Sequence, residues 1–200
     1  MIIAFEGGEG VGKTSHADSL CSFFSERSIP HIHLREPGGS LISEEIRSLF
    51  LKDRLDLITE LLLVLASRRQ NITRLIMPAI EGGKVVVIDR FFDSTLVYQG
   101  MVGGMGVETV RKMMELSDTL MRPDITIILD LDTAEALGRK GPEKNRFDHM
   151  GMEYHQEIRK GFLSLAPLPG HYIIDASRDQ AVVNDDIVSV LEDCGVLSGL

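Results

Sequence analysis

The stretch FEGGEGVGKTS at residues 5–15 holds four glycines, one lysine and two hydroxyl side chains close to the start of the chain. Residues 7–14 match the phosphate-binding loop pattern, in which Gly, four residues of any type, Gly, Lys and a hydroxyl residue follow one another. A short apolar run at residues 1–5 precedes the stretch, and a helical pattern follows it. Strand, loop and helix in this order predict an α/β fold that binds a nucleoside triphosphate, with a ligand-free glycine turn as the alternative.

Each residue type in this loop has a physical role in binding a phosphate chain. Glycines let successive backbone N–H groups curve round phosphate oxygens, and the amino terminus of the following helix adds its dipole. Lys13 is expected to reach the β- and γ-phosphates, and the Thr14 hydroxyl to bind Mg²⁺. The predicted nucleotide-binding residues are Gly7, Gly8, Glu9, Gly10, Val11, Gly12, Lys13, Thr14 and Ser15.

Further apolar runs of strand length alternate with helical patterns along the chain. The expected strands cover residues 1–5, 31–34, 84–89, 124–131 and 171–175, and the expected helices cover 14–27, 43–51, 56–80, 108–121, 152–165 and 180–194. This alternation predicts a five-stranded parallel sheet flanked by helices, the three-layer fold of P-loop NTPases. Ligands of such sheets bind beyond the carboxyl ends of the strands. No Pro/Gly/Ser-rich linker divides the 200 residues, so we expect one domain over residues 1–200.

Composition narrows the class of partner. A net charge of −9 without any block of basic residues argues against a nucleic-acid polymer, although a basic pocket for small phosphates remains possible. The longest apolar run, residues 61–66, is too short to cross a bilayer, and the amino terminus does not resemble a signal peptide. The two cysteines lie far apart in the sequence, which suggests a reducing compartment. We therefore expect a cytoplasmic protein without membrane contact.

Four further segments narrow the class of enzyme: LREPGGS at 34–40, LLLVLASRRQNI at 61–72, IDRFFDSTLVYQG at 88–100 and GRKGPEKNRFD at 138–148. The guanine-reading Asn-Lys-x-Asp of GTPase switches is absent from the sequence, and no Asp-x-x-Gly follows the third expected strand. Together with the opening loop, the segments resemble the bacterial thymidylate kinases in order and spacing, over nearly the whole chain. The resemblance implies transfer of the γ-phosphoryl group of ATP to dTMP, giving dTDP and ADP in dTTP biosynthesis, usually by a homodimer.

The resemblance also implies which residues bind the acceptor nucleotide. Glu9 is expected to face the sugar 3′-hydroxyl or the metal, and Arg68 to contact a thymine carbonyl. Tyr98 and Gln99 resemble the pair that excludes a ribose 2′-hydroxyl and reads the base edge, although a helix end before Gly100 also accounts for them. The full expected acceptor set is Glu9, Arg35, Val64, Arg68, Arg90, Ser94, Tyr98 and Gln99.

Residue chemistry supports part of this set independently. Arginine has a planar fork that grips phosphate or carbonyl oxygens, although surface ion pairing is its commoner role. Arg90 directly follows an apolar strand, at the edge of the sheet where ligands bind. The resemblance implies that Arg90 and Arg35 hold the acceptor phosphate. Asp89 is expected to position Mg²⁺ together with Thr14, with the N-cap of the next helix as its alternative role.

Residues 138–150 are polar and basic in an otherwise acidic chain, and we expect them to form a short lid. Phosphoryl transfer needs positive charge on the migrating group and exclusion of water, and a closing lid supplies both. Some relatives carry an arginine inside the phosphate loop, where this chain has Gly10, so a lid arginine is expected to be catalytic. Arg139 and Arg146 are the candidates, and NRFD around Arg146 matches the family better. The predicted catalytic residues are Lys13, Arg90, Arg139 and Arg146.

The chain departs from the family at Val64, where a phenylalanine usually stacks on thymine. Valine offers no aromatic surface, and Phe91 or Phe92 are candidates to compensate. Three functions therefore remain open at this point: a thymidylate kinase, a kinase for another pyrimidine monophosphate, and a nucleotide-binding regulatory paralog without turnover.

Overall fold

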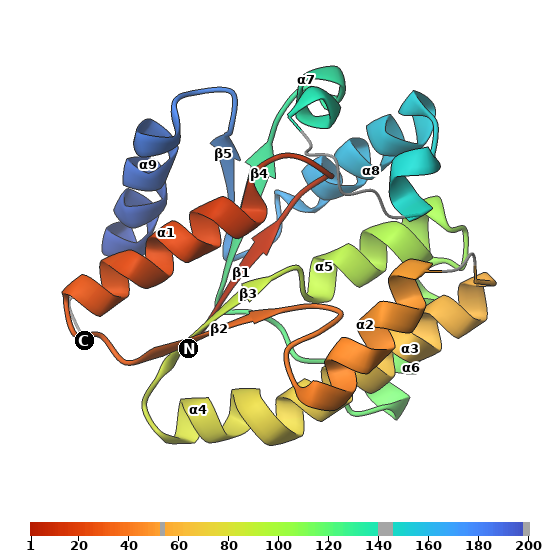
Figure 1. Ribbon diagram of the computed structural model, residues 1–200, viewed down its shortest axis with the longest axis horizontal. Helices are drawn as coiled ribbons and strands as arrows, with labels where there is room; N and C mark the ends of the chain where they lie inside the picture. Colours follow the sequence, from red (N-terminus) through yellow and green to blue (C-terminus); the bar gives the residue numbers. More distant parts are fainter. Residues whose placement is uncertain (53–54, 140–145, 198–200) are drawn as a thin grey trace.

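A parallel sheet organises the computed structural model, which describes residues 1–52, 55–139 and 146–197. In these residues the strands are β1 (Ile2–Glu6), β2 (His31–Arg35), β3 (Val85–Asp89), β4 (Ile125–Asp130) and β5 (His171–Asp175), in the order β2-β3-β1-β4-β5 (Figure 1). Every neighbouring pair is parallel, so all carboxyl ends meet at one edge. The predicted five-stranded parallel sheet is confirmed. Its inner strands β1 and β3 are buried along their whole length, which explains why they read as continuous apolar runs.

Helices cover both faces of the sheet (Figure 1). They are α1 (Lys13–Glu26), α2 (Leu41–Lys52), α3 (Leu57–Asn71), α4 (Met77–Glu81), α5 (Phe92–Thr95), α6 (Val107–Leu116), α7 (Thr133–Gly138), α8 (Met152–Leu165) and α9 (Gln180–Asp193). Alternate strand residues face opposite layers: Phe5 and Val87 belong to the core under α1 and α9, whereas Ala4 and Ile88 belong to the core under α3, α4 and α6.

Two helical regions differ from the sequence prediction. The helix expected at 56–80 begins at Leu57 after its N-cap Asp56, and it contains a π-helix, η1 (Ile72–Ile76), between α3 and α4. The helix expected at 108–121 ends at Leu116, because the chain turns at Asp118, whose φ of 53° lies in the left-handed region.

Three helical segments were not predicted. α5 continues into a second π-helix, η2 (Leu96–Val102), and residues 92–100 are buried on every side. A segment that is buried on every side has no exposed face, so its polar and apolar residues need not alternate with a 3.6-residue period, and the pattern predicted no helix there. α7, capped by the Asp132 carboxylate, and the 3₁₀ helix η3 (Arg146–His149) are too short for such a pattern. Within the described residues, no helix combines the length and apolar content that a membrane span requires.

Candidate functional site

The phosphate loop connects the carboxyl end of β1 to the start of α1, as its sequence predicts. Gly7 has a φ of 134°, and a Cβ placed there would lie 2.5 Å from the Leu129 carbonyl oxygen. Gly10 has a φ of 76°, so an arginine at this position would be held in a strained backbone conformation. The loop is therefore built from backbone, with little room for side chains on its inner side.

Lys13 lies folded over this loop. Its ammonium donates a hydrogen bond to the Gly8 carbonyl oxygen at 2.5 Å. Burial, and then the charge of Arg90, lower the pKa of Lys13 from 10.5 to about 8. An anion bound by the loop would oppose this shift, because negative charge stabilises the protonated amine.

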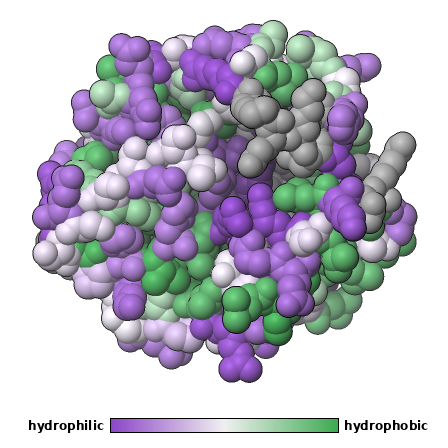
Figure 2. Space-filling view, viewed as in Figure 1, coloured by the Kyte–Doolittle hydropathy of each residue, from purple (hydrophilic) through white to green (hydrophobic). Residues whose placement is uncertain are grey.

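We call the cavity beside this loop the loop pocket. Its lining residues are Glu9, Gly10, Gly12, Lys13, Thr14, Ser15, Arg35, Glu36, Arg47, Asp89, Arg90 and Arg139. The Thr14 hydroxyl donates a hydrogen bond to the Asp89 carboxylate at 2.5 Å, so the two expected metal ligands lie together. Asp89 does not cap the next helix, because the N-cap of α5 is Phe91. Figure 2 shows hydrophilic residues gathered near the middle of the face that it draws. In Figure 1, which has the same view, the strands end in this region.

A second cavity, the aromatic pocket, adjoins the loop pocket. It is lined by Glu9, Glu36, Pro37, Arg47, Phe50, Leu51, Val64, Arg68, Arg90, Phe91, Ser94, Thr95, Tyr98, Gln99 and Phe147. Seven of the eight residues expected to bind the acceptor lie here, and the eighth, Arg35, lines the loop pocket. The Arg35 guanidinium forms an ion pair with Glu44 at 2.8 Å and its side chain is 53% exposed.

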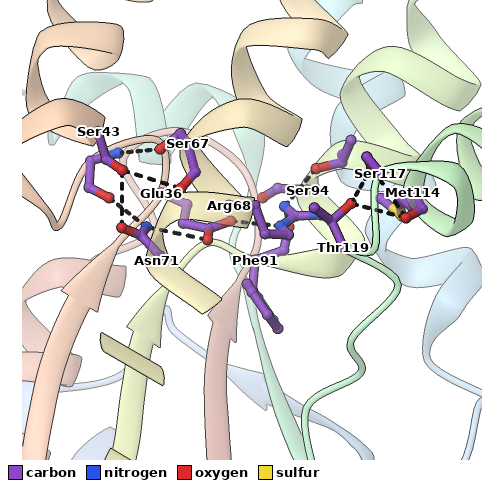
Figure 3. Close-up of polar contacts among 12 residues, drawn as sticks. Glu36, Ser43, Ser67, Arg68, Asn71, Phe91, Ser94, Met114, Ser117 and Thr119 are labelled. Atoms are coloured by element: carbon purple, nitrogen blue, oxygen red, sulfur yellow. Dashed lines mark hydrogen bonds and ion pairs between the residues drawn. The ribbon is translucent and has the colours of Figure 1, made fainter. Parts of the chain in front are cut away.

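Arg68 is the most deeply placed cation of the aromatic pocket, with no exposed surface. Its guanidinium donates to the Glu36 carboxylate at 2.8 Å, to the Phe91 carbonyl oxygen at 2.7 Å and to the Thr95 hydroxyl at 2.8 Å. Figure 3 shows Arg68 between Glu36 and Phe91, with Asn71 continuing the polar network. The buried Nη1 of Arg68 has no hydrogen-bond partner among the described residues. This atom can donate to a polar group that enters the pocket.

Arg90 and Glu9 form a wall shared by the two pockets. The Arg90 backbone has a φ of 64°, a left-handed conformation that is uncommon for a residue other than glycine. Its guanidinium donates to the Gly7 carbonyl oxygen at 3.0 Å and to the Glu9 carboxylate at 2.7 Å, and the Tyr98 hydroxyl donates to Glu9 at 3.2 Å. Lys13 and Arg90 thus open onto one cavity, the loop pocket.

Sequence reasoning missed Glu36 and Arg47, which also line both pockets. Arg47 lies on α2 and donates a hydrogen bond to the Pro37 carbonyl oxygen at 2.8 Å. A single charged residue on an amphipathic helix has no motif, so only the packing of α2 against α3 could reveal Arg47. Glu36 belongs to the segment LREPGGS at 34–40, but only its ion pair with Arg68 in the structure shows that it lies at the pockets.

The two lid arginines occupy different places. Arg139 lines the loop pocket, where it donates to the Ala176 carbonyl oxygen at 2.8 Å and to Glu135 at 2.7 Å. Arg146 forms an ion pair with Glu60 on α3. The basic residues Lys140 and Lys144 of the expected lid lie outside the described residues.

Glu6 is a further buried carboxylate, directly before the phosphate loop. It accepts hydrogen bonds from the Phe91 amide at 2.9 Å, the Ser94 amide at 3.2 Å and the Ser94 hydroxyl at 2.6 Å. Burial, and then the neighbouring Asp93, raise the pKa of Glu6 to about 7. Glu6 therefore ties the base of the phosphate loop to the start of α5.

Comparisons with known proteins place the chain among named relatives. A family model described as thymidylate kinase matches residues 5–187. A protein named thymidylate kinase from Symbiobacterium thermophilum is 41% identical over 199 residues, which cover 96% of this chain and 93% of that protein. Another of that name, from Chlamydia muridarum, is 43% identical over 197 residues, covering 92% and 97%. The crystal structure of thymidylate kinase from Ehrlichia chaffeensis superposes with a TM-score of 0.78 at 31% identity and covers 96% of this chain and 98% of that one.

Proposed function

The chain belongs to the thymidylate kinase family, enzymes that transfer the γ-phosphoryl group of ATP to dTMP, and we propose that its two adjoining pockets hold these two nucleotides. The predicted resemblance, fold and phosphotransferase activity are confirmed by the family model and the relatives. They favour the thymidylate kinase over the two alternatives, because every relative named above carries that function. We treat residues 1–200 as one nucleoside monophosphate kinase domain.

The shared wall is the observation that carries this assignment. ATP would place its phosphate chain in the loop pocket, and dTMP would place its base in the aromatic pocket near Arg68 and Gln99. The acceptor phosphate then lies at Arg90 and Arg47, which line both cavities, with Arg35 approaching from the loop side. Such an arrangement would place the acceptor oxygen facing the γ-phosphorus at the shared wall.

Mg²⁺ fits the same geometry. A hydroxyl and a carboxylate, those of Thr14 and Asp89, offer oxygen ligands at the loop, and hard cations prefer oxygen. Bound there, Mg²⁺ would neutralise charge on the β- and γ-phosphates. Omitting Mg²⁺ should abolish turnover in the wild type, and an Asp89→Asn variant should need a higher Mg²⁺ concentration for half-maximal rate. An unchanged Mg²⁺ requirement would count against Asp89.

The reaction needs no general base, because a phosphate monoester with a second pKa near ~6 is already largely dianionic at neutral pH. The remaining work is alignment and charge neutralisation. Lys13 would bind the migrating phosphoryl group, and Arg90 would hold the acceptor phosphate. Glu9, fixed by Arg90 and Tyr98, would accept a hydrogen bond from the sugar 3′-hydroxyl.

The two lid arginines can be separated by experiment. Arg139 lies in the loop pocket, whereas Arg146 carries the better family match. We expect an alanine variant of the catalytic arginine to lower kcat by roughly 10²- to 10³-fold with little change in ATP affinity. Single-turnover rates of Arg139→Ala and Arg146→Ala identify it, and an unchanged kcat in either variant removes that residue from catalysis.

Homodimerisation is also proposed here. α2 and α3 pack against each other and expose Leu49 (57%), Ile58 (61%) and Leu62 (50%) to solvent. Ile58 and Leu62 lie one turn apart on α3, and a contiguous exposed apolar patch is typical of an interface. Sedimentation of the wild type should give twice the monomer mass, and a Leu62→Glu variant should sediment as a monomer. A monomeric wild type would contradict the proposal.

A cytoplasmic location, with nucleotides as the partners, completes the proposed function. Its support is the pair of free cysteines, Cys21 and Cys194, in the described residues.

An acceptor panel tests the function directly. ADP release is measured with dTMP, dUMP, dCMP and dGMP at equal concentration, with ATP and Mg²⁺ in excess. We expect turnover with dTMP to exceed that with each other acceptor. Preference for another pyrimidine, or ATP binding without any turnover, would establish one of the alternative functions instead.

A further inference from the structure

The aromatic pocket contains phenylalanine rings that the sequence did not assign to it. Phe50 comes from the last turn of α2 and Phe147 from η3, and both line the cavity together with Val64. Of the two residues expected to compensate for Val64, Phe91 lines the pocket beneath Arg68, whereas Phe92 does not line it. The pocket therefore keeps an aromatic surface, although residue 64 does not provide it.

The two rings are held in fixed positions. Phe50 is 5% exposed, and its ring centroid lies 5.8 Å from that of Phe147 at an interplanar angle of 36°. The Tyr98 ring meets Phe147 edge-on, with centroids 5.7 Å apart. The Arg146 guanidinium contacts both rings, at 4.5 Å and 4.4 Å from their centroids, and its ion pair with Glu60 anchors it to α3.

The polar groups of the pocket complement these rings. Arg68 offers the unpaired Nη1, and Gln99 is held by a hydrogen bond from its Nε2 to Glu60 at 3.3 Å. A nucleobase needs a flat apolar surface for its π-face and donors or acceptors for its edge. Phe50 and Phe147 provide the apolar surface, and Arg68 and Gln99 provide the polar groups for the base edge. Val64, one helical turn before Arg68, has a side chain too short and too narrow to provide such a surface.

We infer that Phe50 and Phe147 together form the surface against which the acceptor base packs, in place of the residue at position 64. The inference rests on the proposed assignment of dTMP to the aromatic pocket. It makes Phe50 and Phe147 specificity-determining residues.

The test measures binding, so that it does not depend on turnover. Affinities of dTMP and of 2-deoxyribose 5-phosphate, which lacks the base, are compared by calorimetry in the wild type, Phe50→Leu and Phe147→Leu. Base stacking on an aromatic residue is worth about 1–3 kcal/mol, so each variant should bind dTMP roughly 5- to 140-fold more weakly. The affinity for 2-deoxyribose 5-phosphate should change less than about twofold. A structural disturbance of the pocket would weaken both ligands.

A compensating variant and a control complete the experiment. Val64→Phe in the Phe50→Leu background should recover most of the lost dTMP affinity. Phe24→Leu, which removes an equally buried ring far from both pockets, should lower stability and leave dTMP affinity unchanged. If Phe50→Leu does not fold, Phe147→Leu decides, because Phe147 is only partly buried.

The inference is overturned if Phe147→Leu and a folded Phe50→Leu bind dTMP like the wild type, or if both ligands weaken equally. The proposed function fails separately, if the wild type binds dTMP no better than 2-deoxyribose 5-phosphate or does not phosphorylate it.

Discussion

The loop pocket and the aromatic pocket share a wall but are built in different ways. The phosphate loop is one continuous stretch whose binding groups are backbone amides and the side chains at its end. Besides Glu9 of the phosphate loop, the aromatic pocket takes its side chains from α2, the segment after β2, α3, the segment after β3, the α5–η2 region and Phe147. The first site can lose a side chain and keep its shape, whereas the second depends on buried side chains that also hold the fold together. Substitutions in the loop pocket should therefore lower activity without lowering stability, whereas substitutions in the aromatic pocket should lower both.

The largest effect is expected at Arg68. An Arg68→Met variant leaves Glu36 buried without its ion-pair partner, and breaking such a pair costs about 3–5 kcal/mol of unfolding free energy. Urea denaturation measures the loss, and dTMP affinity should fall as well. The double variant Arg68→Met/Glu36→Leu should recover part of the stability but none of the affinity. A loss below about 1 kcal/mol would show that this pair does not support the fold.

Lys13 should behave in the opposite way. A Lys13→Met variant should lower kcat by roughly 10²- to 10³-fold, the usual effect of removing a group that stabilises charge in the transition state. Its stability at pH 7 should equal or exceed that of the wild type, because burial disfavours the ammonium that the variant removes. The contrast between the pockets breaks down if this variant is as unstable as Arg68→Met.

Glu6 connects the two regions and should make stability depend on pH. Its pKa rises from 4.5 in the unfolded chain to about 7 in the fold, so the folded protein holds a proton that the unfolded chain releases between these values. Stability contributed by this proton is present below pH 4.5 and is lost as the pH rises through 7, by up to about 3 kcal/mol. Unfolding free energies from pH 5 to 8 should show this slope in the wild type. Glu6→Gln, which mimics the protonated acid, should flatten it, and equal slopes would contradict the assignment.

The smallest effect concerns the charge of Lys13 in the free enzyme. With a pKa of about 8, Lys13 loses its proton as the pH rises above that value. The kcat/KM for ATP should then fall about tenfold per pH unit, whereas kcat should hold to higher pH because bound phosphates raise the pKa again. Initial rates between pH 7 and 10 measure both profiles, and a kcat/KM for ATP that stays flat to pH 9.5 would rule out the shift.

The same contrast explains what could be predicted from the sequence. Strand β1, the phosphate loop and α1 were placed to within one or two residues, because the loop is local and its glycines and Lys13 are constrained by their own neighbours in the chain. Strands β3 and β4 followed from their buried apolar runs, and the less buried β2 and β5 followed from apolar runs of strand length. The α5–η2 region did not, because its polar and apolar residues are buried alike and give no periodic signal.

In the aromatic pocket, Arg68, Tyr98 and Gln99 were predicted through the family resemblance, because their spacing in the sequence does not by itself indicate a binding site. Arg47 and Phe50 belong to the same helix, and neither motif nor resemblance pointed to them. Their role depends on how α2 lies against α3, which is a property of tertiary packing. Side chains that converge from separate segments are found only once those segments are placed.

The aromatic pocket has two parts: the wall that it shares with the loop pocket, and a far end. Residues of these two parts should differ in how freely they can be substituted. If the two pockets hold ATP and dTMP as proposed, a substitution at Arg90 or Glu9 disturbs both nucleotides at once, and these positions should be nearly fixed during evolution. Phe50, Val64 and Gln99 line only the far end and can exchange volume among themselves while phosphate handling is preserved. Descendants of this chain, or libraries made from it, should therefore acquire new base preferences through paired exchanges at the far end.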